Sequence, residues 1–319
     1  MQRKTILITG AAGNLGSRLA LSLLDAPHQL RLMVHRTPLP DRLARASGVE
    51  VARADLARPE TLTAAVAGAD VIVHFAGRLF APRPERFLPE TNIRWFSNLT
   101  DAALKAGVGR IVLISFPHTE GPTTPDAPAR GRLDGTPVSV HAATRRAQEA
   151  LLLERSAAAP TTPVVLRLGT VYGRGILMVE AARWLARRRL LAVWKEPTWY
   201  HFLSTPDFLR ATEAAALKEG IQGVYQVADE APTTLQEFLD AACRIWMAPR
   251  PWRAPVWAIY GAASLCELYA LAFGTLAPLT RDFITIGRVP HVADTSRARR
   301  ELVPDLVHPT LETGLSTLA

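Results

Sequence analysis

A short apolar strand that runs straight into a glycine-rich turn restricts the fold of this chain more than any other feature. The strand occupies residues 4–9, the turn follows, and leucines at helical spacing come next. Glycines let the backbone approach a phosphate, and the free N–H groups and dipole of the following helix attract its negative charge. The pattern predicts a strand, turn and helix that bind a dinucleotide pyrophosphate through Gly10, Gly13, Asn14, Leu15 and Gly16.

Strand and helix patterns alternate through the first half of the chain. After the first strand, apolar runs predict strands at 30–34, 49–51, 71–75, 110–115 and 164–168. Helical patterns are found between them at 39–46, 59–66, 92–106 and 141–155. Because several strands are almost entirely apolar, we expect them to be buried on both faces. We predict an α/β fold, a Rossmann-type doubly wound parallel sheet whose ligand lies at the carboxyl ends of the strands.

The second half of the chain has a mixed pattern. Helices are expected at 178–188, 206–217 and 235–246, and short strands near Val193 and at 224–227. Segments 80–89 and 116–137 are rich in proline and follow strands, so we expect loops at the ligand edge. We divide the chain into an NADP-binding domain over 1–173, with a returning segment near 200–230, and a smaller interlocked α+β lobe over 174–319 that mainly binds substrate.

Composition narrows the class of protein. With 319 residues, 48% hydrophobic and 21% charged, the chain is typical of a folded globular protein. Its net charge of +8 favours an anionic ligand such as a phosphorylated cofactor, but no motif accompanies it that would indicate a nucleic-acid partner. The two cysteines and the histidines lack metal-ligand spacing, so no metal is expected. Few cysteines and no apolar leader predict a cytoplasmic location.

Residues 255–278 form a stretch that looks like a membrane segment. It is rich in apolar residues, with Glu267 in its middle and Gly261 and Gly274 near its ends. A spanning helix needs about 20 consecutive apolar residues. A helix that is buried or covers the substrate is therefore the favoured interpretation, and a peripheral membrane contact stays open as the less favoured one.

Short motifs spaced along most of the chain carry a family resemblance. Besides the glycine turn they are Asp55-Leu56, His74-Phe75-Ala76-Gly77, Asn92 at the start of a long helix, and the segment from Arg167 to Gly173. In these motifs the chain resembles the extended short-chain dehydrogenase/reductase superfamily, in its epimerase/dehydratase and 3β-hydroxysteroid dehydrogenase-like branch. The resemblance implies further cofactor contacts at Asp55, Leu56, Phe75, Ala76, Gly77, Leu168, Gly169 and Val171.

The end of the second predicted strand favours NADP over NAD. An acidic residue there would bond the 2′-hydroxyl of the adenosine ribose and repel a 2′-phosphate. This chain has His35-Arg36 and no acid, and arginine offers a fork of donors that suits phosphate. We predict that His35 and Arg36 bind NADP at its ribose, with NAD as the alternative cofactor.

The catalytic positions depart from the family pattern, which is a tyrosine acid/base, a lysine four residues later and a serine after the fifth strand. Here the corresponding helix has His141 and Arg145, and Phe116 takes the serine position, preceded by Ser115. Histidine titrates near neutrality, so we predict His141 as the proton donor. Arg145 is expected to bond the nicotinamide ribose and to disfavour a charged histidine. Ser115, His118 or Glu120 would orient the substrate.

Three functions are compatible with these residues. The favoured one is an oxidoreductase that transfers hydride to or from the carbonyl or alcohol of a largely apolar small molecule. The others are a dinucleotide-binding enzyme of non-redox chemistry, such as a dehydratase, cyclase or isomerase, and a non-catalytic dinucleotide sensor. An enzyme should have a cleft that joins the nicotinamide end to the second lobe.

Two groups of apolar residues suggest further contacts. The second lobe is expected to pack around its tryptophans, some of which would line the substrate pocket: Trp194, Trp199, Trp252 and Trp257. Relatives often form dimers through the helices that flank the fifth strand. A homodimer of that kind is compatible with apolar positions at Leu99, Leu104, Leu151 and Leu152.

Overall fold

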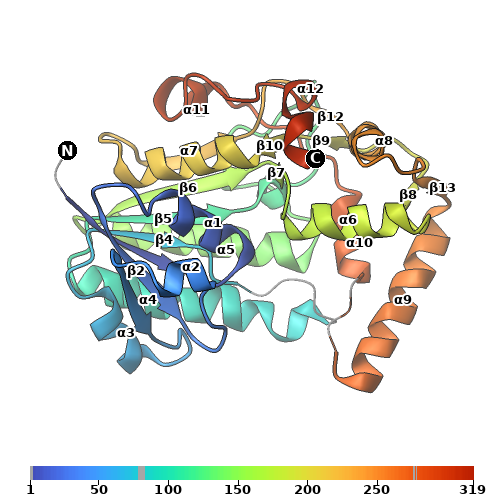
Figure 1. Ribbon diagram of the computed structural model, residues 1–319. Coiled ribbons are helices and arrows are strands. Elements are labelled where there is room, and N and C mark those ends of the chain that lie inside the picture. Colours follow the sequence, from blue (N-terminus) through green and yellow to red (C-terminus); the bar gives the residue numbers. More distant parts are fainter. Residues whose placement is uncertain (1–2, 78–82, 276, 278) are drawn as a thin grey trace.

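A parallel sheet whose central strands are buried on both faces forms the centre of the fold (Figure 1). The computed structural model describes residues 3–77, 83–275, 277 and 279–319. Within them, seven strands pair in parallel in the order β11-β6-β5-β4-β1-β2-β3, which places the switch point between β1 and β4. The strands are β1 (Thr5–Thr9), β2 (Gln29–Val34), β3 (Val49–Arg53), β4 (Val71–His74), β5 (Arg110–Ser115), β6 (Thr162–Leu168) and β11 (Gly223–Val227).

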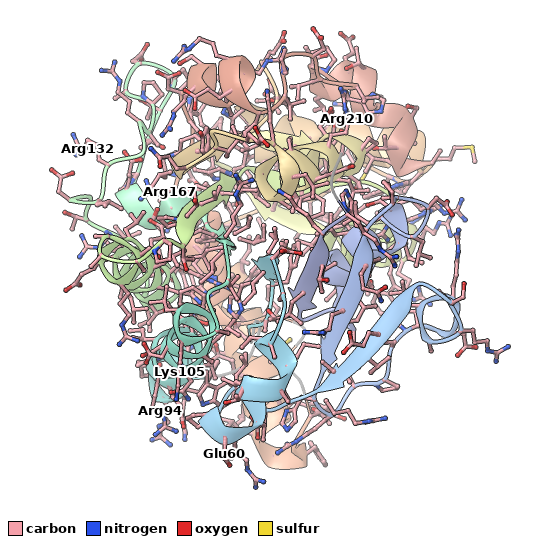
Figure 2. The ribbon with its side chains drawn as sticks, turned by 90° about the vertical axis from the view of Figure 1, so that its left-hand side faces the viewer. Glu60, Arg94, Lys105, Arg132, Arg167 and Arg210 are labelled. Atoms are coloured by element: carbon pink, nitrogen blue, oxygen red, sulfur yellow. The ribbon has the colours of Figure 1, made fainter. Side chains whose placement is uncertain are left out.

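Helices cover both faces of this sheet. Their outer sides carry charged residues, and Figure 2 shows Glu60, Arg94 and Lys105 at the edge of the molecule. The connecting elements are α1 (Asn14–Ser22), α2 (Asp41–Ala44), α3 (Pro59–Val66), the 3₁₀ turn η1 (Pro84–Arg86), the π-helical segment η2 (Pro89–Arg94), α4 (Trp95–Lys105), the 3₁₀ turn η3 (Pro117–Glu120), α5 (Val140–Ser156) and α7 (Thr205–Leu217).

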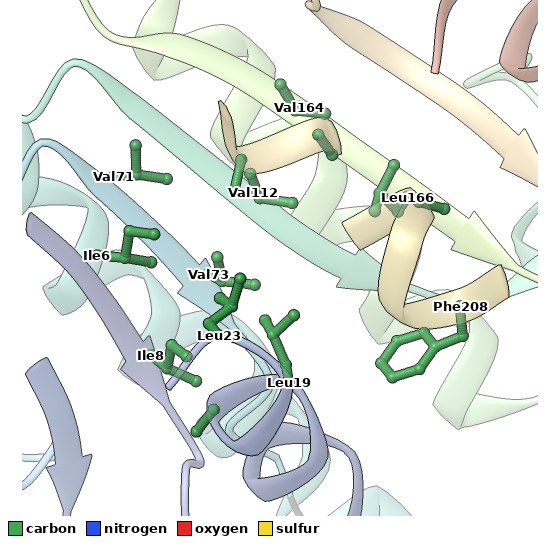
Figure 3. Close-up of a cluster of buried hydrophobic side chains, with 14 of the residues drawn as sticks. Ile6, Ile8, Leu19, Leu23, Val71, Val73, Val112, Val164, Leu166 and Phe208 are labelled. Carbon is green, nitrogen blue, oxygen red and sulfur yellow. The ribbon is translucent and has the colours of Figure 1, made fainter. Parts of the chain in front are cut away.

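The alternation of side chains along each strand produces two separate cores. On one face, Ile6 of β1, Leu19 of α1 and Phe208 of α7 belong to one hydrophobic cluster (Figure 3). Leu7, the next residue of β1, points to the opposite face and packs with Phe96 of α4. Each core is fully dry at these positions, so the sheet and its helices hold the strand ends in fixed places.

A second lobe with its own core follows β7 (Thr170–Tyr172). Its centre is aromatic, and Phe202 and Phe238 stack with ring centroids 4.2 Å apart. The remaining elements are α6 (Leu177–Arg187), β8 (Ala192–Trp194), β9 (Trp199–Tyr200), β10 (Phe202–Ser204), β12 (Thr233–Thr234), α8 (Leu235–Ile245), β13 (Trp252–Ala254), α9 (Val256–Phe273), α10 (Arg281–Gly287), α11 (Ser296–Glu301), α12 (Leu311–Gly314) and the 3₁₀ turn η4 (Leu315–Leu318).

The predicted doubly wound α/β fold is confirmed, and the differences are local. The helix expected at 39–46 shortens to α2 because Leu39 precedes a proline, which disfavours helical backbone there. The helix expected from Asn92 instead begins at Pro89, in the π-helical segment, since proline is tolerated in a first turn. Of the loop expected at 80–89, residues 80–82 lie outside the described part of the chain.

The expectation that residues 255–278 form a buried helix is wrong, and none of the described residues of this stretch lines the main cavity described below. The stretch forms α9, which stands at the edge of the molecule, away from the seven-stranded sheet (Figure 1). Only Ala263, Glu267 and Ala270 of α9 are buried, and Trp257 is 77% exposed. Among the described helices α9 alone has the length and apolar composition to cross a membrane, by those two criteria only.

Two other expectations about apolar residues change with the structure. Leu99 and Leu152 are fully buried in the core of this chain, so they are not available for a dimer interface. Of the four tryptophans expected to pack the second lobe, only Trp194 is buried, because the others lie on strands and a helix at its surface. None of the four lines the main cavity described below.

Candidate active site

The glycine turn has the geometry of a phosphate cradle. Gly10 has φ +68°, and a Cβ added there would lie 2.8 Å from the Ala76 backbone nitrogen. A Cβ at Gly16 would lie 2.4 Å from the Gly10 carbonyl oxygen, so only glycine allows the helix and strand to pack this closely. Gly13 caps α1 without a side chain, which leaves the N–H groups of the first turn free for an anion. These residues fit a dinucleotide.

Asn14 connects this cradle to the second lobe through its side chain. Its Nδ2 donates to the Gly175 carbonyl at 2.8 Å, and its Oδ1 accepts from the Leu177 amide at 3.1 Å. The side chain is therefore occupied within the protein, and a cofactor would meet the backbone of Asn14. The start of α1 and the start of α6 are held together at this point.

A cavity of about 400 Å³ runs from the glycine turn into the second lobe, as an enzyme of this class is expected to have. Most of the residues predicted for cofactor and substrate reach it: Gly10, Gly13, Asn14, Leu15, Gly16, Phe75, Gly77, Ser115, His118, His141, Arg145, Leu168, Gly169 and Val171. Its far wall is largely apolar and comes from α6 and α10, with Ile176, Leu177, Met178, Phe283 and Ile286.

The remaining predicted cofactor residues lie outside this cavity, beyond the ends of the neighbouring strands. His35 Nε2 lies 3.4 Å from the Asp55 carboxylate, and both are partly exposed. Arg36 is exposed and makes no hydrogen bond or ion pair with the residues that the structure describes. The Leu56 side chain packs in the core under α3, so only its backbone is available to a cofactor, and Ala76 is half-buried beside Gly10.

His141 faces the cavity from the first turn of α5. Ser139 caps this helix by accepting a hydrogen bond from the Ala142 amide at 3.1 Å, which fixes where the helix begins. The imidazole packs edge-on against the Phe116 ring, with centroids 4.9 Å apart. Burial, then the charge of Arg145 and then His118, lower the His141 pKa to about 3. The expectation that His141 titrates near neutrality is therefore wrong, and the ring is neutral at pH 7.

Arg145 lies one turn further along α5 and is also buried at the cavity. Its Nη1 donates to Gln148 Oε1 at 2.9 Å, and its Nη2 lies against Gly77, where an added Cβ would be 2.8 Å away. Burial lowers the Arg145 pKa to about 10, while the negative charge of Glu149 raises it. The guanidinium stays charged at neutral pH and disfavours an imidazolium at His141, as the sequence predicted.

Ser115 is bound to a buried ion network behind the cavity. Its hydroxyl donates to Glu149 Oε1, and Arg167 Nη2 lies 2.6 Å from the other oxygen of that carboxylate. Arg167 also reaches Glu120 at 2.6 Å, and all three charged side chains are almost completely buried. The Ser115 hydroxyl has one proton, which Glu149 accepts, so toward a substrate this oxygen can only accept. Glu120 does not line the cavity.

Sequence reasoning missed this network, although one signal for it was present. Arg167 interrupts an apolar strand, and a charge in a strand buried on both faces needs partners. Which acids provide them depends on the packing of α5 and of the segment after β5, which the local pattern does not give. Arg167 lies on β6, and Figure 2 labels its place in the fold.

Besides His141, two more histidines, His118 and His291, lie at or beside the cavity. The sequence analysis assigned a role to His118 and none to His291. The rings of His118 and His291 are 4.4 Å apart, and His118 Nε2 contacts the Val289 carbonyl at 3.2 Å. Burial lowers the pKa of His118 to about 4 and that of His291 well below its usual value. Both rings are therefore neutral. In the described ranges no three His, Cys, Asp or Glu side chains gather as a metal site.

Asp282 is a second group that the sequence did not single out. It lines the cavity from α10, and burial followed by the negative charges of Glu85 and Glu267 raises its pKa to about 6. It is thus a carboxyl group at the cavity that titrates near neutral pH.

Comparison with known proteins gives the family of the chain. The model of the NAD dependent epimerase/dehydratase family matches residues 6–228. The chain belongs to this family. It is therefore an enzyme of the extended short-chain dehydrogenase/reductase type, in a family that binds NAD(P).

Individual relatives agree with this assignment. A 2-alkyl-3-oxoalkanoate reductase of Stenotrophomonas maltophilia is 28% identical over 332 residues, which cover 98% of each chain. MoeE5, solved in complex with UDP-glucose and NAD, superposes with a TM-score of 0.76 at 21% identity, over 98% of this chain and 97% of that one. UDP-glucose 4-epimerase of Thermotoga maritima gives a TM-score of 0.77 at 17% identity, with the same coverage. Likenesses this distant show the fold.

Removing the central charge of the buried network should be costly. Arg167→Met leaves Glu149 and Glu120 without their cation, so we expect a loss of about 3–5 kcal/mol in unfolding free energy. Arg155→Met, which breaks the surface pair with Asp101, should cost at most about 1 kcal/mol. Urea unfolding monitored by circular dichroism measures both. Equal losses would mean that the network contributes no more than a surface ion pair.

The buried histidines predict acid sensitivity. Five of them have lowered pKa values: His74 and His141 about 3, His118 and His201 about 4, and His291 well below normal. The unfolded chain takes up protons as the pH falls through about 6.5, whereas the folded chain does not. Stability is therefore complete above that pH and declines toward pH 4, by about 1.4 kcal/mol per pH unit for each histidine.

Two carboxyl groups act in the opposite direction, but five histidines outweigh them. Asp229 and Asp282, with pKa values raised to about 8 and about 6, hold a proton more tightly in the folded state. The urea midpoint should therefore be lower at pH 5 than at pH 7. His118→Gln should flatten this dependence, because it removes one of the five buried rings. A midpoint that is equal or higher at pH 5 would contradict the neutral state of these rings.

Proposed function

We propose that the protein is an NADP-dependent oxidoreductase that acts on the carbonyl or alcohol of a largely apolar small molecule. The observation that carries the proposal is the single cavity that passes from the glycine turn, along His141 and Arg145, to the apolar wall formed by α6 and α10. Residues 1–173 would mainly bind the cofactor, and residues 174–319 would mainly bind the substrate. The related reductase named for 2-alkyl-3-oxoalkanoates supports an alkyl ketone as substrate.

The pair His141 and Arg145 would replace the tyrosine and lysine of the family. A bound NADPH supplies hydride. The neutral His141 ring would donate its N–H to the substrate oxygen, and the Arg145 charge would stabilise the negative charge that develops there. Burial and then the Arg145 charge hold the ring in its neutral form, so His141 would donate a hydrogen bond from its N–H, and the proton that completes the alcohol would come from water. Ser115 would only accept a hydrogen bond from the substrate.

NADP is the proposed cofactor because of Arg36. Asp55, the nearby carboxylate, is engaged by His35 at 3.4 Å and by the Ala57 amide at 2.9 Å. Arg36 has no partner among the described residues and can meet a 2′-phosphate with two donors.

A non-redox reaction is the second candidate function. Asp282 favours it, because this carboxyl group lines the cavity and titrates near neutral pH independently of the His141 and Arg145 pair. Such an enzyme would convert its substrate with no net change in NADPH. A non-catalytic sensor would bind the nucleotide and convert nothing.

Arg36→Ala tests the choice of cofactor. Loss of a charged hydrogen-bond donor to phosphate costs about 1.5–3 kcal/mol, so the Kd for NADPH should rise about tenfold to a hundredfold. The Kd for NADH should not change. Arg45→Ala is the matched control, since Arg45 is also an exposed arginine and, among the residues that the structure describes, its side chain pairs only with Asp41. Isothermal titration calorimetry measures both cofactors. Unchanged discrimination in Arg36→Ala would remove NADP from the proposal.

His141→Phe tests the chemistry. The ring keeps its apolar packing against Phe116 but loses its N–H, so kcat should fall about a hundredfold or more while the Kd for NADPH stays the same. The assay follows NADPH oxidation with a panel of alkyl ketones that includes a 2-alkyl-3-oxoalkanoate. His308→Phe, away from the cavity, should keep full activity. Full activity in His141→Phe would contradict the assignment.

A further inference from the structure

The outer face of α9 is largely apolar, and the described part of the chain leaves it exposed. Glu267 is the helix's one charged residue, and it is buried, with its carboxylate 2.8 Å from Arg281 Nε. The side chains that point outward include Trp257 at 77%, Leu265 at 70% and Phe273 at 68% exposed. A soluble helix normally presents charged residues to water, so a helix apolar on all sides implies that something else covers it.

Arginine and tryptophan gather at the amino end of α9. β13 precedes the helix and pairs with β8, and Trp252 Nε1 donates to the Arg189 carbonyl at 2.9 Å. The run 187–189 of exposed arginines therefore lies beside Trp252, which is itself 67% exposed. Another exposed tryptophan, Trp184, lies under the Arg188 guanidinium at 4.0 Å. Aromatic and basic side chains together are typical of the surface layer of a bilayer.

The charge of this region is strongly one-sided. Segments 181–193 and 244–273 contain seven arginines and one acidic residue, Glu267, in a chain whose net charge is +8. Glu267 is buried against Arg281, so it does not neutralise the seven arginines. One of them, Arg253, pairs with Asp240, which lies outside the two segments. The surface around α9 is therefore complementary to an anionic partner.

We propose that the outer face of α9, with the arginines at its amino end, docks on the surface of an anionic phospholipid bilayer. The helix would lie in the plane of the interface, because it is packed on α10 and joined to β13 within the same fold. A second copy of this chain fits less well. A twofold interface brings the same patch of both copies together, and two arginine-rich patches repel each other.

This docking would also bring the bilayer close to the apolar end of the cavity. α10 packs against α9, and its residues Phe283 and Ile286 line the cavity wall. Leu177 and Met178 of α6 line it too and are exposed. One helix therefore separates the bilayer from the apolar end of the cavity. The consequence for substrate entry rests on the proposed function, whereas the docking itself does not.

Vesicle flotation with the full chain, without cofactor or substrate, tests the proposal. Vesicles of phosphatidylcholine mixed with phosphatidylglycerol should carry the protein to the top of the gradient, and vesicles of phosphatidylcholine alone should carry much less. Leu265→Ser with Leu268→Ser should weaken binding about tenfold or more, since both side chains are exposed and apolar. Exchanging all three arginines of the run 187–189 for glutamine should remove the preference for anionic vesicles.

A control and a second measurement keep the outcomes separate. Val51→Ser with Val307→Ser changes two exposed apolar residues elsewhere and should leave flotation unchanged. In the wild-type chain, brominated lipid should quench tryptophan fluorescence, and Trp257→Phe should reduce the quenched fraction. Failure of the wild type to float with either vesicle, or equal flotation of the α9 variant, would overturn the proposal. A wild-type dimer that the α9 variant converts to monomer would do so as well, in favour of a second copy.

Discussion

The buried charge of Arg167 is the interaction on which the candidate active site depends. Its guanidinium joins β6 to Glu149 of α5 and to Glu120 of the turn after β5, and Glu149 in turn holds Ser115 at the end of β5. Three separate elements are thereby fixed to the carboxyl edge of the sheet. Buried ions are costly unless every partner is present, so this arrangement exists in one geometry or not at all.

The network also determines the chemistry at the cavity. It uses the one proton of the Ser115 hydroxyl and places the negative Glu149 near Arg145, which keeps that guanidinium charged despite its burial. Burial, and then the charge of Arg145, keep His141 neutral. The two replacements for the family's tyrosine and lysine are therefore coupled electrostatically. A neutral donor beside a fixed cation is suited to an oxygen that gains negative charge, and unsuited to one that needs an imidazolium.

Much of the fold could be predicted from the sequence, because its signals are local. The glycine turn, the apolar strands and the helices between them each occupy a few consecutive residues, and their alternation predicts a doubly wound parallel sheet. The residues that line the cavity at the ends of those strands could therefore also be predicted as cofactor or substrate contacts. The protonation state of His141 could not, since it depends on burial by Phe116 and on a charge from the next turn of the helix. The partners of Arg167 likewise come from distant segments.

The helix α9 is another element whose local sequence was not sufficient to predict its place in the structure. Its apolar composition favoured a buried helix, but the structure leaves most of it exposed. Glu267 determines which face of α9 points outward. Its carboxylate accepts a hydrogen bond from the Arg281 amide at 2.7 Å and another from the Arg281 side chain. Rotating α9 to bury Leu265 and Leu268 would turn Glu267 to the outside and leave those contacts unmade. One ion pair thus sets the rotation of the helix about its axis, and its apolar face points away from the protein as a result.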